Sequence, residues 1–273
     1  AKDVKYILLR NYLHFNYGFE IIGFIGKTYF VNLNQHNALS LLKKIKKMTQ
    51  WSHAFIQDVP FPQFIQDLKI TKKWRKGSIS NFDYLMKLNI FGGRSFNESS
   101  MYPVFPWIIK DYTSNQINLD DENIYRNLSI PIGATSKARL NELKEHTPDF
   151  DIFGKESYLY NSCYVSPLCV FLWLIRMEPF TTLHISLQSG KFDYAARLFS
   201  SINSSFQMSC SYVNDYRELI PEFFYCPSFL ENRNNFDLGA FNGKKVNDVI
   251  LPSWCSSAID FIYIHRKALE SEY

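Results

Sequence analysis

The chain has 273 residues, 46% of them hydrophobic and 21% charged, as expected for a globular protein with a buried core. Its formal net charge of +4 does not indicate a nucleic-acid-binding protein, which needs a concentrated basic surface. The longest apolar run, 168–175, is too short for a membrane-spanning helix of about 20 residues.

Cysteine usage and the two chain ends point to a cytoplasmic fragment. Five cysteines without a CxxC pair argue against a disulfide framework or a zinc ribbon and favour reduced thiols. The chain begins without methionine and without a signal-peptide pattern, and it ends inside an expected helix. We therefore expect a piece cut at both ends from a longer protein.

The first 50 residues are expected to be strands followed by one helix. Segments 4–9, 20–25 and 27–33 are rich in β-branched and aromatic residues, and Gly26 predicts a hairpin turn between the last two. Helical spacing of apolar residues then predicts a helix over 37–48, with Asn37 as its N-cap. This order is typical of the last part of a PH-like domain.

The expected helix over 37–48 carries four lysines, Lys43, Lys44, Lys46 and Lys47. Such a cluster can bind anionic lipid headgroups. It is also typical of the solvated face of a surface helix, and this second reading is favoured because surface lysines are common.

The rest of the chain is expected to be mainly helical, after a linker over 51–63 that contains Pro60 and Pro62. In the central apolar helix, Ser166 is the expected N-cap and Pro167 the first residue. The predicted helices span 64–74, 80–89, 135–146, 165–177, 180–189, 193–210 and 257–271.

Two aromatic segments, 101–107 and 222–230, are broken by prolines. Proline prevents long regular structure there, while the aromatic residues favour burial. We therefore expect extended backbone inside the core, with amide groups that must be satisfied by polar side chains. The candidates for this role are Asn81, Arg94, Asn97, Glu178, Asn235 and Asp237.

Many short motifs in a fixed order carry a family resemblance. They include Ile79–Leu85, Gly93–Asn97, Tyr102–Trp107, Tyr125–Ser129, Pro131–Ala134, Arg176–Thr181, Gly190–Asp193, Glu218–Phe224, Asn235–Gly239 and Val249–Trp254. With these motifs the chain resembles the BEACH domain family from residue 74 onward. We expect a BEACH domain over 64–273, truncated at its C-terminus, after a PH-like part over 1–50.

The resemblance implies a mainly α fold with extended irregular core segments, onto which a PH-like domain docks and which a WD40 propeller often follows. It also implies a non-catalytic, cofactor-free cytoplasmic scaffold that binds protein partners in vesicle, lysosome-related, autophagy or receptor traffic, peripheral on vesicle or endolysosomal membranes. One motif departs from the family pattern, because Asn161 and Cys163 stand where a glycine and a histidine are usual. Properties that depend on that histidine are therefore not expected here, and the motifs do not separate the subfamilies.

Catalytic interpretations find little support, since the chain has no GxSxG, HExxH or P-loop motif. Gly92–Ser95 could hold a phosphate, with Arg94 as the charged group, but a glycine turn whose arginine pairs with a buried carboxylate is the favoured reading. Asp149 and Asp151 resemble a DxD metal site, although ordinary acidic loop residues explain them equally well. Cys163 and His265 could act as a nucleophile and its base, although a buried thiol explains Cys163 equally well.

A set of charged residues lies beside prolines and aromatic residues, where burial is expected. Their charges nearly cancel, so we predict an internal network of ion pairs and hydrogen bonds. The charged members are Arg94, Arg176, Glu178, Glu222 and Glu270.

Two functions follow from the sequence. The first is a scaffold that recognises protein partners through the PH–BEACH unit, which the abundance of aromatic residues favours. The alternative is a peripheral membrane module that binds anionic lipid through the helix over 37–48.

Overall fold

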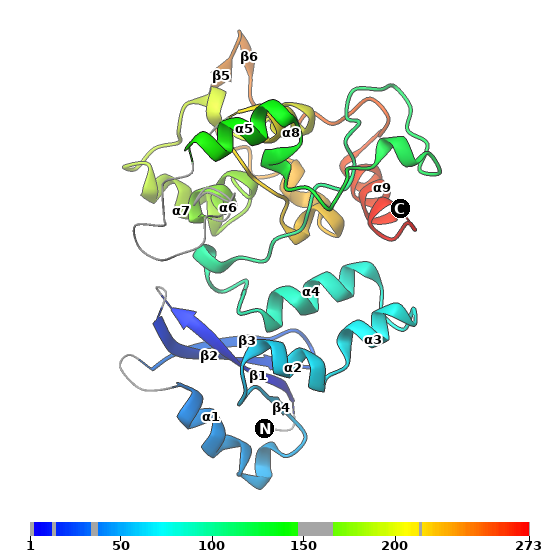
Figure 1. Cartoon of the computed structure of the whole chain (residues 1–273). Coiled ribbons are helices and arrows are strands. Elements are labelled where there is room, and N and C mark those ends of the chain that lie inside the picture. Colours follow the sequence, from blue (N-terminus) through cyan, green and yellow to red (C-terminus); the bar gives the residue numbers. More distant parts are fainter. Residues whose placement is uncertain (1–2, 13–14, 34–37, 147–165, 213–214, 273) are drawn as a thin grey trace. The chain divides into compact units, whose positions relative to one another are not determined.

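The computed structural model describes residues 3–12, 15–33, 38–146, 166–212 and 215–272 (Figure 1). The chain divides into two compact units, Ala1–Pro103 (unit 1) and Val104–Tyr273 (unit 2). Unit 1 is rich in strands and unit 2 is mainly helical and irregular. Within the described ranges, no helix has the length and apolar character needed to cross a bilayer.

Unit 1 contains a four-stranded sheet with the strand order β3-β2-β1-β4. β1 (Val4–Tyr12), β2 (Phe15–Gly23) and β3 (Thr28–Asn32) are antiparallel neighbours, and β4 (Phe55–Ile56) pairs with β1 in parallel. The turn between β2 and β3 contains Gly26 at φ 80°, a conformation that glycine adopts without strain. The predicted hairpin is thus confirmed.

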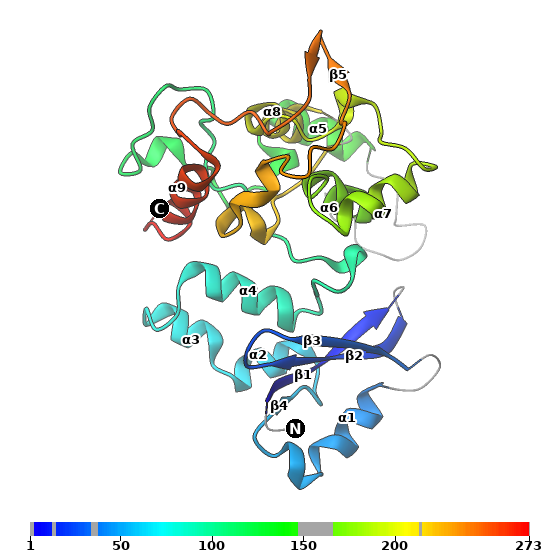
Figure 2. The ribbon, with the colours of Figure 1, turned by 180° about the vertical axis from the view of Figure 1, so that it is seen from behind.

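Helices cover both faces of this sheet, as Figures 1 and 2 show. On one face Ile7, Phe19 and Ile56 pack against Leu42 of α1 (Ala38–Lys46). The other face packs against three helices, α2 (Phe61–Asp67), α3 (Ile70–Arg75) and α4 (Asn81–Phe91). Because side chains alternate along a strand, the neighbouring residues Ile7 and Leu8 lie in separate cores.

Unit 1 differs from the sequence expectation in two places. The segment expected as a linker supplies β4, and Gln57 is buried beside it, with Oε1 accepting a hydrogen bond from the Leu9 amide at 3.2 Å. The helix expected over 64–74 is two helices, since Lys69 has a left-handed backbone at φ 53° that separates α2 from α3. Asn37, the expected N-cap, lies outside the described residues.

The helices of unit 2 are short and several begin at a serine cap. They are α5 (Lys137–His146), α6 (Pro167–Trp173), α7 (Phe180–Leu187), α8 (Ile202–Ser211) and α9 (Ala258–Leu269). The hydroxyl groups of Ser166, Ser201 and Ser257 accept hydrogen bonds from amides in the first turns of α6, α8 and α9. A small hairpin, β5 (Ala240–Phe241) and β6 (Lys244–Lys245), turns at Asn242 and Gly243.

Two predicted helices of unit 2 are shorter than expected. α6 ends at Trp173 rather than residue 177, although Leu174 and Ile175 after it are fully buried. The helix expected over 193–210 begins only at Ile202, after a 3-10 helix over Ala195–Arg197 and an extended stretch over 198–201. There the Ser200 carbonyl accepts from the Ile250 amide at 2.8 Å, and the Ile250 carbonyl accepts from the Ile202 amide at 3.1 Å.

The segment over 102–107 is extended backbone inside the core, as predicted. The same prediction is wrong for 222–230, which forms two 3-10 helices, Pro221–Phe224 and Pro227–Leu230, because the fixed φ of a proline is compatible with the first position of a helix. Phe105 and Trp107 are completely buried, as are Phe223 and Phe224, while Tyr225 is half exposed. Phe105 and Leu219 exchange two backbone hydrogen bonds of 2.8 Å, an isolated bridge between segments far apart in sequence. Trp107 packs edge-on against the rings of Trp173 and Phe206 at the centre of the unit.

Candidate functional site

Unit 2 contains a buried pair of opposite charges, Arg126 and Glu218. Their side chains are joined by an ion pair of 2.9 Å, and both residues are less than 10% exposed. Glu218 also accepts a hydrogen bond of 2.8 Å from the Trp107 amide, while Arg126 donates to the carbonyls of Trp107 and Ile130. The pair therefore satisfies the polar backbone of the segment around Trp107.

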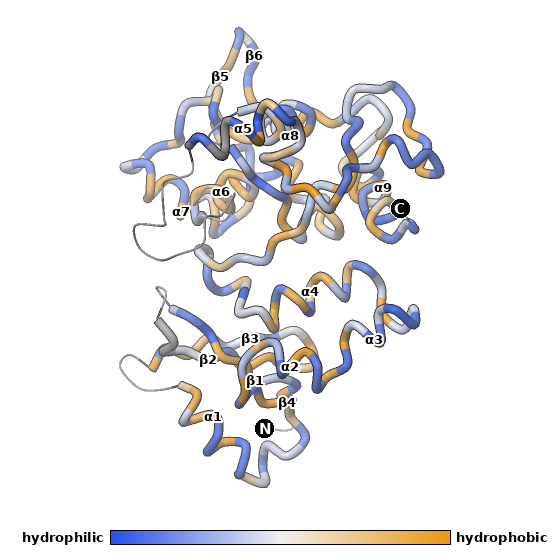
Figure 3. Tube along the Cα trace, viewed as in Figure 1, coloured by the Kyte–Doolittle hydropathy of each residue, from blue (hydrophilic) through white to orange (hydrophobic). Residues whose placement is uncertain are grey.

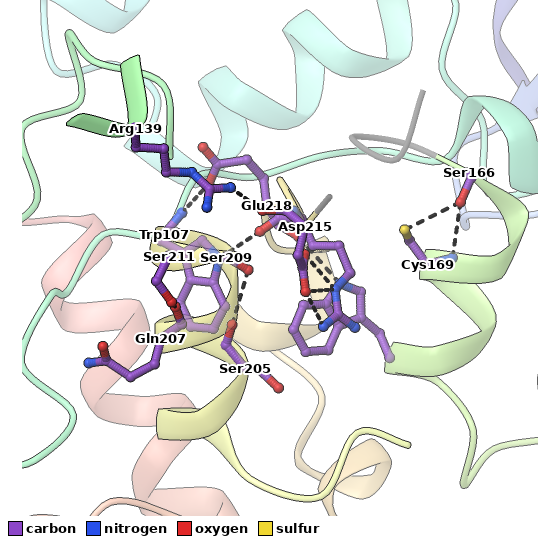
Figure 4. A network of polar contacts seen from close by, with 12 residues as sticks. Trp107, Arg139, Ser166, Cys169, Ser205, Gln207, Ser209, Ser211, Asp215 and Glu218 are labelled. Atoms are coloured by element: carbon purple, nitrogen blue, oxygen red, sulfur yellow. Dashed lines mark hydrogen bonds and ion pairs between the residues drawn. The ribbon is translucent and has the colours of Figure 1, made fainter. Parts of the chain in front are cut away.

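Further polar contacts lie along the same stretch of chain (Figure 4). Arg217 forms a bidentate pair with Asp215, with contacts of 2.6–3.1 Å, and its guanidinium lies over the Trp173 ring. Arg139 of α5 donates to the carbonyls of Gly133 and Asp215. In Figure 4, Trp107, Glu218, Asp215 and Arg139 are grouped together, and the bonds tie α5 to the irregular segment before Glu218.

The pKa shifts of the buried groups at this site indicate a structural role. Burial raises the pKa of Glu218, while the Arg126 guanidinium and the Trp107 amide oppose this shift. Burial also raises the pKa of the Cys210 thiol, which makes this thiol a poor nucleophile. The oxygens of the Glu218 side chain are bonded to Arg126 and the Trp107 amide, so the site holds backbone in place.

Two members of the predicted network are deeply buried, but they lie in different surroundings. Arg176 is 1% exposed and donates to the carbonyls of Phe199 and Asn247, at 2.7 and 2.8 Å. Burial lowers its pKa to about 10. The carboxylate of Glu222 accepts a hydrogen bond of 3.1 Å from the Tyr225 hydroxyl.

Three further members of the set belong to unit 1 and also make separate contacts. Arg94 donates to the Tyr102 carbonyl at 3.0 Å, so it does satisfy the backbone of an aromatic segment. Asn81 accepts from the indole of Trp74 at 2.7 Å. Asn97 donates to the carboxylate of Glu20 at 2.7 Å.

The remaining four residues of the set, Glu178, Asn235, Asp237 and Glu270, are exposed at the surface. Their positions differ from the burial that we expected. Glu178 accepts from the Thr182 amide, and Glu270 pairs with Arg266 within α9. The buried amide of this region is Asn232, which bonds to the carbonyl and amide of Phe236. Residues 232–235 are an unbroken polar run, Asn-Arg-Asn-Asn, so the sequence gave no signal that separated Asn232 from Asn235.

Replacing Arg176 by methionine is expected to lower the free energy of unfolding by about 2–4 kcal/mol, because two buried carbonyl groups lose their donors. Replacing the exposed Glu178 by glutamine is the matched control and should change it by less than about 0.5 kcal/mol. Urea unfolding of both variants measures the difference. Equal effects would contradict the role assigned to Arg176.

A buried histidine, His265, lies in the C-terminal half of α9. The His265 imidazole is fully buried among aromatic rings, and its Nε2 is hydrogen bonded to the Tyr112 hydroxyl at 3.1 Å. Burial lowers its pKa to about 3. The imidazole is therefore neutral in the folded protein at any pH near neutrality.

This histidine should make folding sensitive to acid. The folded pKa lies below the unfolded value near 6.5, so its contribution to stability is complete above about pH 6.5 and is lost progressively as the pH falls toward 3. Between pH 6.5 and 5 the free energy of unfolding should fall by about 2 kcal/mol more in the wild type than in His265→Phe. Urea unfolding at both pH values measures this slope. A His265→Phe variant that keeps the wild-type slope would contradict this role of His265.

Unit 1 contains its own buried pair, Arg10 and Glu20, which face each other across β1 and β2. Their charged atoms are 2.6 Å apart and both side chains are about 97% buried or more. Arg10 also donates to the Ile90 carbonyl at the end of α4, while Ser95 and Asn97 donate to Glu20. This pair was not among the residues predicted from the sequence, although a charge within an apolar strand was an available signal.

The four lysines of the expected lipid site lie on α1 and just after it, and all four are exposed. Lys46 forms an exposed ion pair of 2.8 Å with Asp58. The other three, Lys43, Lys44 and Lys47, extend the basic surface.

A groove of about 560 Å³ lies on unit 2 between the loop over 115–120 and α9. Its lining mixes amide side chains, an acidic and a basic residue, and two aromatic rings. Lining residues include Gln116, Asn118, Asp120, Trp254, Tyr263 and Lys267.

The candidate catalytic groups are not assembled in the part of the chain that the structure covers. In Gly92–Ser95, the Arg94 guanidinium and the Ser95 hydroxyl point to the Tyr102 carbonyl and the Glu20 carboxylate. Asp149, Asp151, Asn161 and Cys163 lie outside the described residues. Among the described residues, no three His, Cys, Asp or Glu side chains are grouped to hold a metal ion.

Comparison with known proteins agrees with the motif order. The family model of the Beige/BEACH domain matches residues 72–273. The chain is 44% identical over 203 residues to BEACH domain-containing protein B of Arabidopsis thaliana and 45% identical over 211 residues to BEACH domain-containing protein lvsD of Dictyostelium discoideum. These matches cover 74% and 77% of the chain but only 8% and 7% of the relatives' lengths. The chain therefore belongs to the BEACH domain family.

Proposed function

We propose that the chain is part of a non-catalytic scaffold in vesicle trafficking, acting in lysosome-related, autophagy or receptor traffic. Membership of the BEACH family, whose proteins are known in vesicle trafficking, supports this role. The observation that carries the proposal is the use of buried charge. The buried pairs, Arg126 with Glu218 and Arg10 with Glu20, bond to each other and to backbone within the core, as in a supporting framework.

The groove beside α9 is the best candidate for a partner-binding surface. Tyr263 is 60% exposed and Lys267 lies 5.6 Å from its ring centre, so an aromatic group and a cation are presented together. Ile259, one turn earlier on α9, is 66% exposed. Exposed aromatic and basic side chains of this kind often supply much of the binding energy at protein interfaces.

Affinity capture followed by mass spectrometry tests this assignment. The wild type should retain proteins that a Tyr263→Ala, Lys267→Glu double variant loses. The matched control is Tyr194→Ala with Lys191→Glu, which changes another exposed tyrosine and lysine elsewhere on unit 2. The assignment is wrong if the two variants retain the same proteins as the wild type.

We also propose that the strand-rich part over 1–50 is the end of a PH-like domain that docks on the BEACH domain. Contacts inside unit 1 support this. Glu20 of β2 accepts hydrogen bonds from Ser95 and Asn97, which belong to the stretch matched by the family model. A hydrophobic core between the sheet and α2–α4 adds to them.

An alternative function is peripheral binding of anionic lipid through α1. The exposure of Lys43, Lys44 and Lys47 beside the half-exposed Met48 favours it. Flotation with anionic liposomes tests it, because changing all four lysines of this cluster to glutamate should then abolish binding. Unchanged flotation of that variant would exclude α1 as the contact.

A further inference from the structure

The net charge of the chain conceals a strong separation of charge between its units. Unit 1 has fifteen Lys and Arg residues against six Asp and Glu, a formal charge of +9. Unit 2 has fifteen against twenty, a formal charge of −5. Unit 1 is therefore a strongly basic body, to which anionic surfaces are attracted over a Debye length.

Much of this charge is concentrated at α3. Lys72 and Lys73 lie on α3, and Lys69 and Lys76 flank it as its N-cap and C-cap residues, so four lysines stand close together along this short helix and at its two ends. All four side chains are exposed, and Figure 3 shows the hydrophilic colouring of this helix. These four lysines are called the α3 stripe.

The opposite side of α3 is fixed to α4. The Trp74 ring stacks on Tyr84 with ring centres 4.5 Å apart and an interplanar angle of 6°. The Trp74 indole donates to Asn81, and the hydroxyl groups of Thr71 and Tyr84 are 3.3 Å apart. Ile70 is buried in the core beneath. The stripe is thus held on a rigid support and faces solvent.

The charges of the stripe are not balanced inside the described part of the protein. None of its four ammonium groups forms an ion pair there, in contrast to Lys46, which pairs with Asp58. The acidic residue nearest in sequence, Asp67, accepts instead from the amide of Gln63. Like charges at these spacings repel one another, and an anionic ligand would remove this repulsion.

We propose that the α3 stripe is a binding site for the phosphate-bearing surface of an anionic membrane. The six residues of α3 span about 9 Å, and lysines lie along this length and at both of its ends, which is more than one headgroup occupies. Lysine is a hydrated point charge without the bidentate geometry of arginine, so the stripe suits a field of many charges better than one shaped carboxylate or phosphate ligand. This site goes beyond the proposed function, which assigns no residue of α3.

Co-flotation of the chain of residues 1–273 with liposomes tests the proposal. Neutral phosphatidylcholine vesicles are compared with vesicles that contain phosphatidylserine at low and physiological salt. The wild type should float only with the anionic vesicles, and Lys72→Gln alone should lower partitioning about fivefold. The quadruple variant Lys69→Glu, Lys72→Glu, Lys73→Glu, Lys76→Glu should lower it at least tenfold and leave the melting temperature unchanged or higher.

A control with the same change in net charge replaces four exposed lysines of unit 2, Lys110, Lys137, Lys191 and Lys244, by glutamate. The partitioning of this control to anionic vesicles should fall less than threefold. The proposal is overturned if the wild type does not float, if the α3 variant floats like the wild type, or if the control loses as much as the α3 variant. Binding of soluble polyglutamate through the stripe without binding of vesicles would equally overturn it, in favour of an acidic protein partner. The variant with all four α1-cluster lysines changed to glutamate is tested in parallel. If it floats like the wild type while the α3 variant does not, lipid binding through α1 is excluded and binding through the α3 stripe is supported.

Discussion

Replacing Arg126 by methionine is expected to lower the free energy of unfolding by about 3–5 kcal/mol. The substitution leaves the buried carboxylate of Glu218 without its cation and removes the donors to the carbonyls of Trp107 and Ile130. Urea unfolding followed by tryptophan fluorescence measures the change. Arg266→Met is the matched control, because Arg266 forms a partly exposed pair with Glu270 that should be worth less than about 1 kcal/mol.

The pH dependence identifies the cause of this loss. Burial raises the pKa of Glu218, and the Arg126 guanidinium opposes this shift, so removing Arg126 should raise the pKa of Glu218 further. The loss of unfolding free energy in the variant should therefore be largest at high pH, where the Glu218 carboxylate is charged, and should shrink as the pH falls through its raised pKa. Adding Glu218→Gln should restore at least about 1 kcal/mol, since it removes the unpaired charge. A double variant as unstable as the single one would contradict this explanation.

Replacing Arg10 by methionine is expected to destabilise unit 1 by a similar amount, about 3–5 kcal/mol. Glu20 would remain buried between β2 and the segment over 95–97, and the Ile90 carbonyl would lose its donor. Hydrogen exchange should then accelerate in β1, in β2 and in the last turn of α4 together, because the pair connects these elements.

Lys46→Met serves as the matched control for Arg10→Met, since it removes a lysine from an exposed pair with Asp58 in the same unit. Its effect should stay below about 1 kcal/mol. If exchange accelerated in the sheet but not in α4, the pair would support the sheet alone. The proposed docking of the N-terminal strands on the family-matched segment would then lose its main polar contact.

Local patterns predicted a good part of the fold. The hairpin at Gly26 and the burial of 102–107 follow from residue types, because a glycine turn and a proline-rich aromatic stretch constrain the backbone within a few positions. Helix ends were less predictable. The extended stretch before α8 is fixed by backbone bonds to Ile250, about 50 residues away, which helical spacing around 193–210 cannot reveal.

The buried charges were the part that the sequence could not place. Arg126 and Glu218 are 92 positions apart, so the sequence around either residue does not indicate that the other is its partner. Proximity to proline and aromatic residues was a poor guide, since it selected Glu178 and Glu270, which are exposed. A better signal was a charge inside an apolar run, as Glu20 is between Phe19 and Ile21 and Glu218 is before Leu219.

The bridge between Phe105 and Leu219 has a consequence for biosynthesis. The Trp107 amide can form its hydrogen bond only after Glu218, 111 residues later, has been synthesised. The backbone bonds of Phe105 likewise require Leu219. At roughly 5–20 residues per second, a ribosome needs several seconds or more to deliver that partner. During this interval a hydrophobic stretch with unsatisfied backbone leaves the exit tunnel before its core can form, and chaperones are the natural means of protecting it.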